Sequence, residues 1–357
     1  MVVYLLISLS FILASIFDVF YIKWNNYQKF YCYIIFVLLL FIVVGGRACG
    51  FDYDNYKYYY ENIQHSVYWN SNADYFGIEK GYAVLNYICS SFRQLLLVMA
   101  FLTMGTYSIF IYKKSPLPFL SLFLLLGAFV YPMMMGQYRQ ALAIGFVLMS
   151  ILYSNHLFLF LSFIGLASFF HISALLSLLL LFVPKRICNK KTYVILLLIA
   201  LITNLLLGNI FGNYLSLFPS FIENKMEIYT EAEQNMRYGL NMAMLLRIAI
   251  FGLFWWKRDS LLRYKDGIYF LNIYFLSLLI YLGLGFLPQL GGRGSIYFYF
   301  FEIILASMLI KTEVNRKHKI GVLILFLLLG TYRQITFFSE WGDEFIPYKY
   351  DFLSWRI

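Results

Sequence analysis

Residues 131–143 read Tyr-Pro-Met-Met-Met-Gly-Gln-Tyr-Arg-Gln-Ala-Leu-Ala, and after an apolar helix residues 169–174 read Phe-Phe-His-Ile-Ser-Ala. Apolar segments flank Arg139 and His171 on both sides, so each is expected near the end of a membrane span. An unpaired charge at such a place costs about 2 kcal/mol or more. Arg139 therefore either snorkels to the lipid headgroups or belongs to a polar cavity that holds an anion.

The composition of the whole chain is that of a membrane protein. Of its 357 residues, 62% are hydrophobic and 13% are charged, whereas ordinary soluble proteins have about 25% charged residues. The length allows roughly a dozen spans of about 20 residues each. The net charge of +10 does not predict nucleic-acid binding, because the basic residues lie in short clusters between apolar runs, as the positive-inside rule requires. We predict a single all-α integral membrane domain over residues 1–357.

The four cysteines indicate neither a metal site nor a disulfide framework. Cys32, Cys49, Cys89 and Cys188 show no paired metal-ligand spacing. Only Cys49 and Cys89 are expected on the same outer side, where their pairing stays an open alternative. The sequence also lacks a Walker loop, a dinucleotide fingerprint and a nucleophile elbow. We expect no metal and no cofactor, which weakens the case for ATP-driven hydrolysis and for metal-dependent nucleotide-sugar transfer.

The basic clusters predict about twelve spans, with both termini on the outer, periplasmic side. Val2 to Phe17 and Phe30 to Val44 flank a basic loop, which is expected in the cytoplasm. The run from Leu157 to Val183 is too long for one comfortable helix, and a single crossing would place the next basic cluster outside. Two short spans that meet near His171 restore the parity and put His171 on the same side as Arg139. The other predicted spans are 95–112, 116–135, 141–153, 193–211, 241–256, 267–287, 295–310 and 322–335.

Several polar segments are predicted on the outer face. Residues 45–80 and 212–238 are net acidic loops, and residues 336–357 form an external tail. Residues 81–92 are expected as an amphipathic helix at the outer interface, with Tyr82 and Asn86 on one stripe. More than half of the 28 Lys and Arg residues fall in the predicted cytoplasmic loops, and most of the 18 acidic residues fall on the outer face.

Arginines at span ends are the main candidates for substrate binding. A guanidinium group is planar, stays charged and donates two parallel hydrogen bonds to an oxyanion. Arg47, Arg139, Arg247 and Arg293 come from four separate spans or span ends, so they can converge only in the folded bundle. A lipid pyrophosphate at the membrane surface fits such an arrangement. Arg247 lies inside an apolar run and has the alternative of pairing with Glu302 across two spans.

The chain carries short motifs in a particular order, and these provide a further clue. They are Arg47 followed by Gly-Phe-Asp-Tyr-Asp-Asn-Tyr at 50–56, Glu-Lys-Gly-Tyr at 79–82 with Leu-Asn at 85–86, Arg-Gln-Ala-Leu-Ala at 139–143, Phe-His-Ile-Ser-Ala at 170–174 and Arg-Gly-Ser-Ile-Tyr at 293–297. In this order they resemble the EpsG family, which groups with the Wzy-type polymerases of O-antigen, capsule and exopolysaccharide. The resemblance covers most of the chain from Arg47 to Tyr297, and Ile346-Pro347-Tyr348 also resembles the family.

The resemblance implies a multi-pass glycosyltransferase of the bacterial inner membrane that acts on the outer side. Such an enzyme transfers a growing glycan from undecaprenyl pyrophosphate to a hydroxyl of another lipid-linked repeat unit, without metal or nucleotide. Pyrophosphate is already an activated leaving group, so the site has mainly to stabilise charge and position the acceptor. The expected partners are the undecaprenyl-pyrophosphate-linked oligosaccharide, membrane lipids and a chain-length regulator protein, with no nucleic acid.

A general base would help the acceptor hydroxyl, and Asp52, Glu79 and His171 are the candidates. Each has a structural alternative. Asp52 or Asp54 would cap the helix that starts near Tyr56, Glu79 would begin the interfacial helix, and His171 would satisfy backbone carbonyls at the break between two short spans. The predicted substrate-binding residues are Arg47, Tyr56, Tyr82, Asn86, Arg139, Gln140, Arg247, Arg293 and Tyr297.

Two other functional classes stay open. An O-antigen ligase shares the lipid-pyrophosphate chemistry, but it is expected to have a larger external loop than the segments around Asn70 or Glu227. A lipid-linked oligosaccharide flippase or another transporter is expected to show internal repeats and charges deep in its spans, and the sequence shows no clear repeat.

Overall fold

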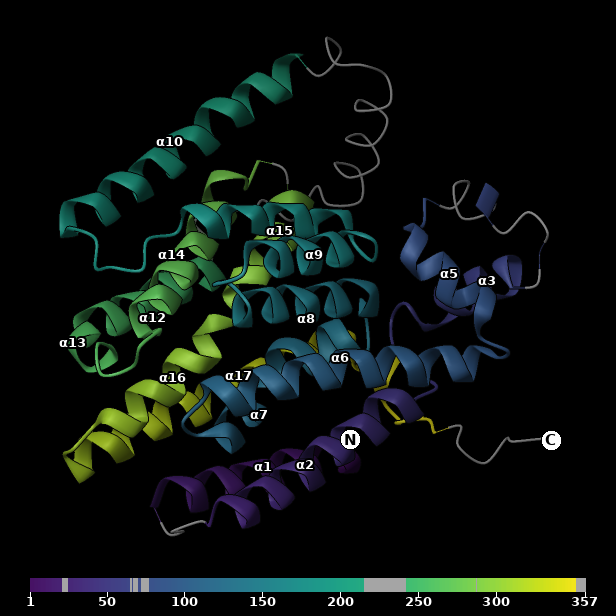
Figure 1. Cartoon of the computed structure of the whole chain (residues 1–357), viewed down its shortest axis with the longest axis horizontal. Helices are drawn as coiled ribbons and strands as arrows, with labels where there is room; N and C mark the ends of the chain where they lie inside the picture. Colours follow the sequence, from purple (N-terminus) through teal and green to yellow (C-terminus); the bar gives the residue numbers. More distant parts are fainter. Residues whose placement is uncertain are drawn as a thin grey trace. The chain divides into compact units, whose positions relative to one another are not determined.

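The computed structural model is built from α-helices and describes residues 1–20, 25–64, 66, 70–71, 77–214, 242–286 and 288–350 (Figure 1). Within these ranges there is no β-strand, although an isolated antiparallel bridge joins Arg47 and Tyr350. In the same described ranges, 6 helices are long and apolar enough to cross a membrane, and further apolar helices are shorter. The chain is therefore a multi-pass membrane protein, as its composition indicates. The number of crossings and the side on which each terminus lies stay predictions.

Within the membrane domain predicted over residues 1–357, the helices group into two compact units. The first unit comprises residues 1–175 and 306–357, and the second comprises residues 176–305. The first contains α1 (Val2–Phe20), α2 (Asn26–Gly46), α3 (Tyr53–Ile63), α5 (Lys80–Ile88), α6 (Phe92–Lys114), α7 (Pro118–Leu125), η1 (Leu126–Met134), α8 (Tyr138–Leu152), α9 (Leu157–Ser168) and α17 (Arg316–Phe345). The second contains α10 (Lys190–Tyr214), α12 (Met242–Trp256), α13 (Arg258–Leu261), α14 (Gly267–Gly283) and α15 (Pro288–Tyr299). Helices η2 (Ile172–Phe182) and α16 (Phe301–Thr312) begin in one unit and end in the other.

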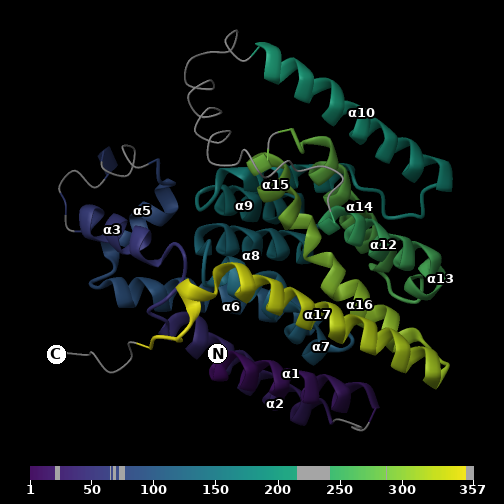
Figure 2. The same cartoon turned by 180° about the vertical axis from the view of Figure 1, so that it is seen from behind.

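The core of the first unit is formed by α7, η1 and α8. All residues of α7 and nearly all of α8 are buried, which is the pattern of helices that are apolar on every side. In Figures 1 and 2, α8 lies between α6 and α9. By contrast, α1 exposes a leucine-rich face that suits contact with lipid, formed by Leu5, Leu6, Leu9 and Leu13. Helix α8, which begins at Tyr138, is thus packed against its neighbours along nearly its whole length.

The segment that leads into α8 is a wide helix. Residues 126–134 form a π-helix with Pro132 inside it. Proline has no backbone N–H and its ring clashes with the preceding turn, so it disrupts the regular hydrogen-bond pattern of an α-helix. The chain then turns at 135–137, and α8 begins at Tyr138. This turn places Arg139 in the first turn of α8.

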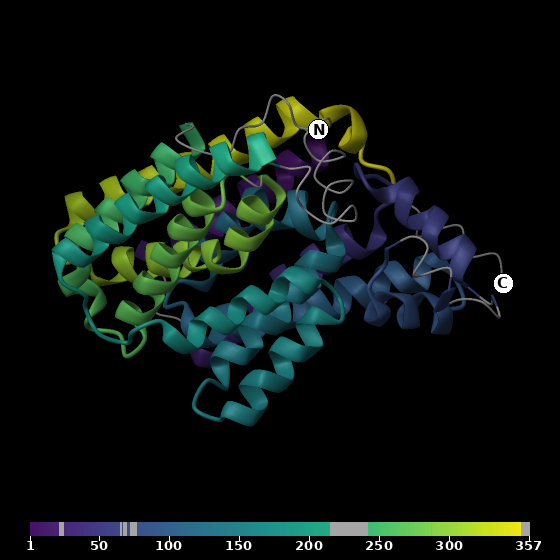
Figure 3. The same cartoon turned by 90° about the horizontal axis from the view of Figure 1, so that it is seen from above.

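Helices α3 and α5 form a small subassembly at one end of the first unit. They lie together beside one end of α6 in Figure 1, and the view from above in Figure 3 also places them at one end. Helix α3 falls within the predicted external loop 45–80, and α5 corresponds to the predicted interfacial helix 81–92. The stripe of Tyr82 and Asn86 on α5 faces inward, because both side chains are buried.

The break predicted near His171 is present. Helix α9 ends at Ser168 and η2 begins at Ile172, so the long apolar run is divided into two short helices. The N–H of His171 donates to the Ala167 carbonyl oxygen at 3.0 Å, and the His171 carbonyl oxygen accepts from the N–H of Ala174 at 3.0 Å. The backbone therefore remains hydrogen-bonded through the break, as an apolar environment requires.

The two short helices carry a prediction about topology. In a variant without the native cysteines, a cysteine at Asn189 should not react with an impermeant thiol reagent added from outside, whereas one at Ser339 should react. The reason is the charge parity around the break at His171. Both positions are exposed, so burial does not explain a lack of labelling. Labelling of Asn189 from outside would contradict two crossings between Leu157 and Val183.

Some boundaries differ from those predicted. Helix α17 extends from Arg316 to Phe345, whereas the predicted span covers only 322–335, so part of the predicted external tail is helical. It bends at Trp341, where φ is −118° and ψ is 15°. Most of the predicted loop 212–238, Asn72 and the end of the tail lie outside the described residues. All four cysteines are free, so the structure contains no Cys49–Cys89 disulfide.

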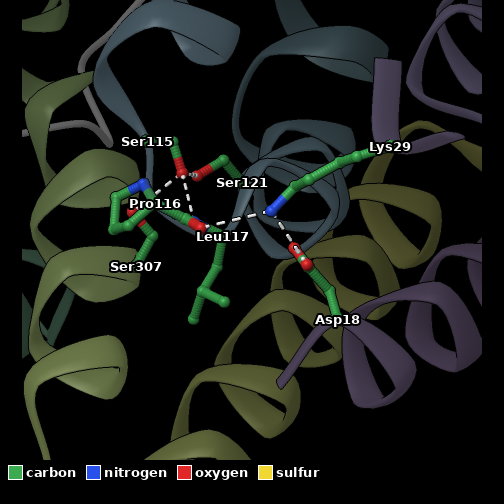
Figure 4. A network of polar contacts seen from close by, with 7 residues as sticks. All are labelled: Asp18, Lys29, Ser115, Pro116, Leu117, Ser121 and Ser307. Carbon is green, nitrogen blue, oxygen red and sulfur yellow. Dashed lines mark hydrogen bonds and ion pairs between the residues drawn. The ribbon is translucent and has the colours of Figure 1, made fainter. Parts of the chain in front are cut away.

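A polar network joins helix ends in the first unit (Figure 4). Lys29 Nζ lies 2.9 Å from Asp18 Oδ1 and donates to the Pro116 carbonyl oxygen at 3.4 Å. In the same network Ser115 Oγ contacts Ser121 Oγ at 2.8 Å and Ser307 Oγ at 2.9 Å. These contacts tie α1 and α2 to the loop between α6 and α7, and that loop to α16.

The buried ion pair in this network predicts a non-additive double mutant. The Asp18 side chain is only 2% exposed, so Lys29→Met leaves a buried carboxylate without its partner, which costs about 3 kcal/mol or more. Adding Asp18→Asn should recover much of that loss, because the second variant removes the buried charge. Thermal unfolding of the single and double variants in detergent measures the effect. Equal and additive losses would show that the pair does not stabilise the fold.

Candidate functional site

Arg139 is paired with Glu79, which lies 60 residues earlier in the chain. Arg139 Nη1 is 2.5 Å from Glu79 Oε2, and the two side chains are 21% and 19% exposed. Glu79 occupies the N-cap position of α5 but makes no side-chain capping hydrogen bond. Its carboxylate therefore serves Arg139 instead of the helix end. The pair is shielded enough to be strong and open enough for an anionic ligand to reach it.

Tyrosine side chains form the walls around Arg139. Arg139 Cζ lies 5.6 Å from the ring centroids of both Tyr56 and Tyr82, a distance at which a cation is attracted to the ring face. The rings of Tyr56 and Tyr138 are tilted against each other, with centroids 3.9 Å apart. The hydroxyl groups of Tyr82 and Tyr138 are hydrogen-bonded, and a side-chain hydrogen bond joins Tyr56 to Arg139. We call Arg139, Glu79, Tyr56, Tyr82 and Tyr138 the Arg139 site.

Burial keeps Tyr56 on α3 and Tyr82 on α5 neutral. Burial raises the pKa of the Tyr56 and Tyr82 hydroxyl groups above the ordinary tyrosine value. Both hydroxyls therefore keep their protons at physiological pH and can donate hydrogen bonds. Positive charge in the Arg139 site comes from one guanidinium, and negative charge comes from Glu79.

Arg47 contacts the Arg139 site through the ring of Tyr138. Its side chain is only 1% exposed, and its Nη1 donates to the Val44 carbonyl oxygen at 2.5 Å. Arg47 Cζ lies 5.6 Å from the ring centroid of Tyr138. We predicted that Arg47 binds substrate. In this structure it is buried against Tyr138, and its role in substrate binding stays a prediction.

The end of the chain holds the loop that carries Arg47. The N–H of Ala48 donates to the Lys349 carbonyl oxygen at 2.8 Å, and the Tyr348 hydroxyl donates to the Val43 carbonyl oxygen at 2.8 Å. A Cβ atom at Gly46 would meet the Tyr350 ring at 2.5 Å, so only glycine allows this approach. The segment Ile346-Pro347-Tyr348 thus contributes to the site through Arg47.

Asp52 lies beside the Arg139 site. It occupies the N-cap position of α3 but makes no side-chain capping hydrogen bond, so the capping alternative lacks its expected contact. Its negative charge contributes to the raised pKa of Tyr56, after the larger effect of burial. Asp52 is partly exposed, and its role as a general base stays a prediction.

The segment that carries His171 contacts the start of α5. The N–H of Gly81 donates to the Phe169 carbonyl oxygen at 2.9 Å, and a Cβ atom at position 81 would meet that oxygen at 2.7 Å. His171 itself is partly exposed, and its Nδ1 lies 2.7 Å from Ser173 Oγ. This hydrogen bond orients the imidazole ring. The break in the apolar run is thus attached to the helix that presents Glu79.

A comparison with models of known protein families gives a match that includes all of these residues. A family model described as the EpsG family matches residues 30–350. The chain belongs to the EpsG family. Membership indicates a polysaccharide polymerase-like membrane protein, consistent with glycosyltransferase-like chemistry. Searches of the curated proteins and of the solved structures found no significant match.

The second unit of this EpsG family member holds the remaining predicted arginines. Arg247 Cζ lies 4.1 Å from the ring centroid of Tyr299 and 4.7 Å from that of Tyr281. The Tyr274 hydroxyl donates to Glu302 Oε2 at 2.8 Å and lies 3.3 Å from the Arg247 carbonyl oxygen. Tyr274 therefore links the helices of Arg247 and Glu302, and both the substrate-binding role and the structural role of Arg247 stay predictions.

Arg293 and Tyr297 lie one turn apart on α15, where Arg293 is partly exposed and Tyr297 is buried. These residues belong to the second unit, whereas the Arg139 site belongs to the first. The convergence of the four predicted arginines therefore stays a prediction.

In the first unit, Gln140 and Asn86 are buried, and Asn86 Nδ2 donates to the Tyr82 carbonyl oxygen at 2.7 Å. Asn86 thus supports Tyr82 in the Arg139 site, and substrate binding by Gln140 and Asn86 stays a prediction.

Two residues at or near the Arg139 site, Tyr138 and Tyr348, were not predicted from the sequence. Tyr138 precedes Arg139 directly and contacts both Tyr56 and Tyr82, but a chain with 32 Tyr residues offers no signal that singles it out. Tyr348 lies in the motif Ile346-Pro347-Tyr348, which resembles the family, but the motif alone did not indicate that Tyr348 lies near Arg47.

Among the described residues, no group of three or more His, Cys, Asp or Glu side chains could hold a metal ion. Metal independence stays a prediction.

Proposed function

We propose that this EpsG family member is a polysaccharide polymerase. It transfers a glycan from undecaprenyl pyrophosphate to a hydroxyl group of another lipid-linked repeat unit, at the outer face of the bacterial inner membrane. The product belongs to O-antigen, capsule or exopolysaccharide biosynthesis. The observation that supports the proposal best is the partly exposed Arg139 guanidinium, held by Glu79 and by tyrosine rings.

Arg139 has donors to offer a pyrophosphate group. A guanidinium carries five N–H donors, and the contacts to Glu79 and Tyr56 use only part of them. Its Nε has no hydrogen-bond partner within the described residues. The tyrosine rings lower the cost of holding the charge and fix the plane of the fork. A site fixed in this way stabilises the negative charge that develops on the departing pyrophosphate.

The proposed reaction breaks one bond and forms one. The acceptor hydroxyl oxygen attacks the anomeric carbon of the donor sugar, and the bond from that carbon to the pyrophosphate oxygen breaks. The acceptor proton passes to a general base, and undecaprenyl pyrophosphate leaves with the bonding electron pair. The reaction needs no oxidant and no nucleotide.

We assign the base role to His171. Glu79 is committed to Arg139 at 2.5 Å, and a neutral imidazole can accept a proton near neutral pH. The hydrogen bond between His171 Nδ1 and Ser173 Oγ orients the ring for that task. Asp52 and Glu79 are then left to contact sugar hydroxyls or to balance the charge of Arg139.

Deletion of the gene, followed by gel analysis of surface glycan, tests the proposal. A polymerase mutant should lose the ladder of long chains and keep a single repeat unit on the lipid core. Loss of both the ladder and the single unit would instead indicate a ligase or a flippase. Complementation with the wild-type chain should restore the ladder, whereas the Arg139→Ala variant should not.

A further inference from the structure

The second unit contains a cavity among residues that the proposed reaction does not use. Its volume is about 190 Å³, and it lies between the end of η2, the loop that follows, the first turn of α10 and α14. Most of its wall is apolar and is formed by residues such as Leu179, Leu196, Phe275 and Leu279. An apolar cavity of this kind suits a hydrocarbon chain and not a sugar.

The polar side chains in the wall are used by the protein itself. Asn272 Nδ2 donates to the carbonyl oxygens of Pro184 and Arg186, at 2.7 and 3.0 Å. Asn272 Oδ1 accepts from the Tyr193 hydroxyl at 2.5 Å. These bonds fix the loop against α14 and α10. They shape the rim of the cavity and leave its interior apolar.

The loop at the rim is strongly basic. Residues 184–191 read Pro-Lys-Arg-Ile-Cys-Asn-Lys-Lys, with no acidic residue, and the basic side chains are exposed. Lys185 Nζ lies 5.5 Å from the ring centroid of Tyr269, and Lys190 Nζ lies 5.5 Å from that of Trp255. Tyrosine and tryptophan are enriched at the level of the lipid headgroups. From this enrichment we expect the ammonium groups at the level of the lipid phosphates.

Part of the apolar rim is exposed. Leu179 and Leu196 are each 38% exposed, and Phe182 is 81% exposed. An acyl chain from the surrounding bilayer can thus enter between these side chains. A soluble partner would have to cover the same apolar surface inside the membrane, which disfavours it.

We propose that the cavity and the basic loop bind an anionic phospholipid of the bilayer, with an acyl chain in the cavity and the phosphate group on the loop lysines. Basic pockets between transmembrane helices on the cytoplasmic side bind anionic headgroups. The basic loop belongs to the clusters that the positive-inside rule assigns to the cytoplasm. The bound lipid would hold the end of η2 against α10 and α14.

Lipid binding to the purified protein tests this site without reference to polymerase activity. Phosphatidylglycerol and phosphatidylcholine with the same acyl chains are titrated against the protein in detergent, and bound lipid is counted by native mass spectrometry. The protein should prefer phosphatidylglycerol by about tenfold or more, and the preference should fall as salt is added. Equal binding of the two lipids would overturn the proposal.

Two variants separate the headgroup contacts from the cavity. Replacing Lys185, Lys190 and Lys191 with glutamine should weaken phosphatidylglycerol binding on the order of 100-fold. The matched control replaces Arg316, Lys317 and Lys319, which form another basic cluster, and should bind as the wild type does. Unchanged binding by the first variant would overturn the proposal.

Leu276→Trp fills the cavity and leaves every charge in place. It should weaken the binding of both lipids, because their acyl chains can no longer enter the cavity. The matched control, Leu198→Trp, adds the same side chain at a position that is 52% exposed and does not line the cavity. If Leu276→Trp binds phosphatidylglycerol as tightly as the wild type does, the lipid is attracted only by surface charge, and the cavity is not a lipid site.

Discussion

The Arg139→Lys variant is expected to lose chain growth almost as completely as Arg139→Ala, by roughly 100-fold or more. Lysine keeps the charge but offers a compact ammonium group in place of a planar fork, so it cannot reproduce two parallel hydrogen bonds to pyrophosphate. It also loses the stacking of the guanidinium over Tyr56 and Tyr82. The measurement is polymer length on gels at matched protein level, followed by turnover of the purified variants.

Arg258→Lys is the matched control for this prediction. Arg258 Cζ also lies over an aromatic ring, 4.5 Å from the centroid of Trp255, but it belongs to a predicted cytoplasmic cluster. Its replacement should leave chain growth unchanged. Full polymer length with Arg139→Lys would return Arg139 to the role of a snorkelling residue. The same substitution at Arg293 tests whether the second unit supplies a further phosphate contact.

The second large effect is expected for His171→Gln, which should lower turnover by roughly 100-fold while the protein still folds. Glutamine can keep a hydrogen bond to Ser173, so it preserves the local structure at the break between α9 and η2. It cannot accept a proton. The measurement compares chain growth by His171→Gln, Asp52→Asn and Glu79→Gln at matched enzyme concentration.

The carboxylate variants are the controls for the base assignment. Glu79→Gln should weaken substrate binding more than the chemical step, because it removes the partner that orients Arg139. Asp52→Asn should have a smaller effect than His171→Gln. Near-normal growth by His171→Gln, with collapse in one carboxylate variant, would move the base role to that carboxylate and leave His171 as a structural residue.

The helices and the break were predictable because both depend on local chemistry. The run from Leu157 to Val183 exceeds the length of one span, and the basic cluster that follows it requires an even number of crossings. The shape of η1 was not predictable to the same extent. Pro132 indicates a distortion in an apolar helix, but neighbouring helices decide which backbone hydrogen bonds replace the lost ones.

The pairing inside the Arg139 site could not be predicted from the sequence. Arg139 and Glu79 were both candidates, but the ion pair joins α8 to α5 and depends on how those helices pack. The burial of candidate residues could not be predicted either. Arg47 has the right side chain for phosphate, and it is only 1% exposed, with its Cζ 5.6 Å from the Tyr138 ring centroid. Its role in substrate binding stays a prediction. Exposure of a polar group in a membrane bundle follows from tertiary packing, on which local composition carries no information.

The bounds of α17 could be predicted only in part from the sequence. The apolar run at 322–335 marks only the part of the helix that suits hydrocarbon. The helix begins earlier because Asn315 caps it, accepting hydrogen bonds from the N–H groups of Lys317 and His318. It continues to Phe345, next to the segment that holds Arg47. Near its end, the Glu344 carbonyl oxygen accepts from the N–H of Gly50 at 3.0 Å, so this part of the predicted tail packs against the segment that follows Arg47. Its external side stays a prediction.

The most direct test of the central claim is a reconstitution of chain growth. Purified protein in nanodiscs is supplied with a synthetic undecaprenyl-pyrophosphate-linked repeat unit and no nucleotide sugar or ATP. The account predicts a ladder of longer glycans, with one undecaprenyl pyrophosphate released for each new linkage, and neither product with Arg139→Ala. Absence of both products from the well-folded wild-type protein, or equal ladders from wild type and Arg139→Ala, would contradict it.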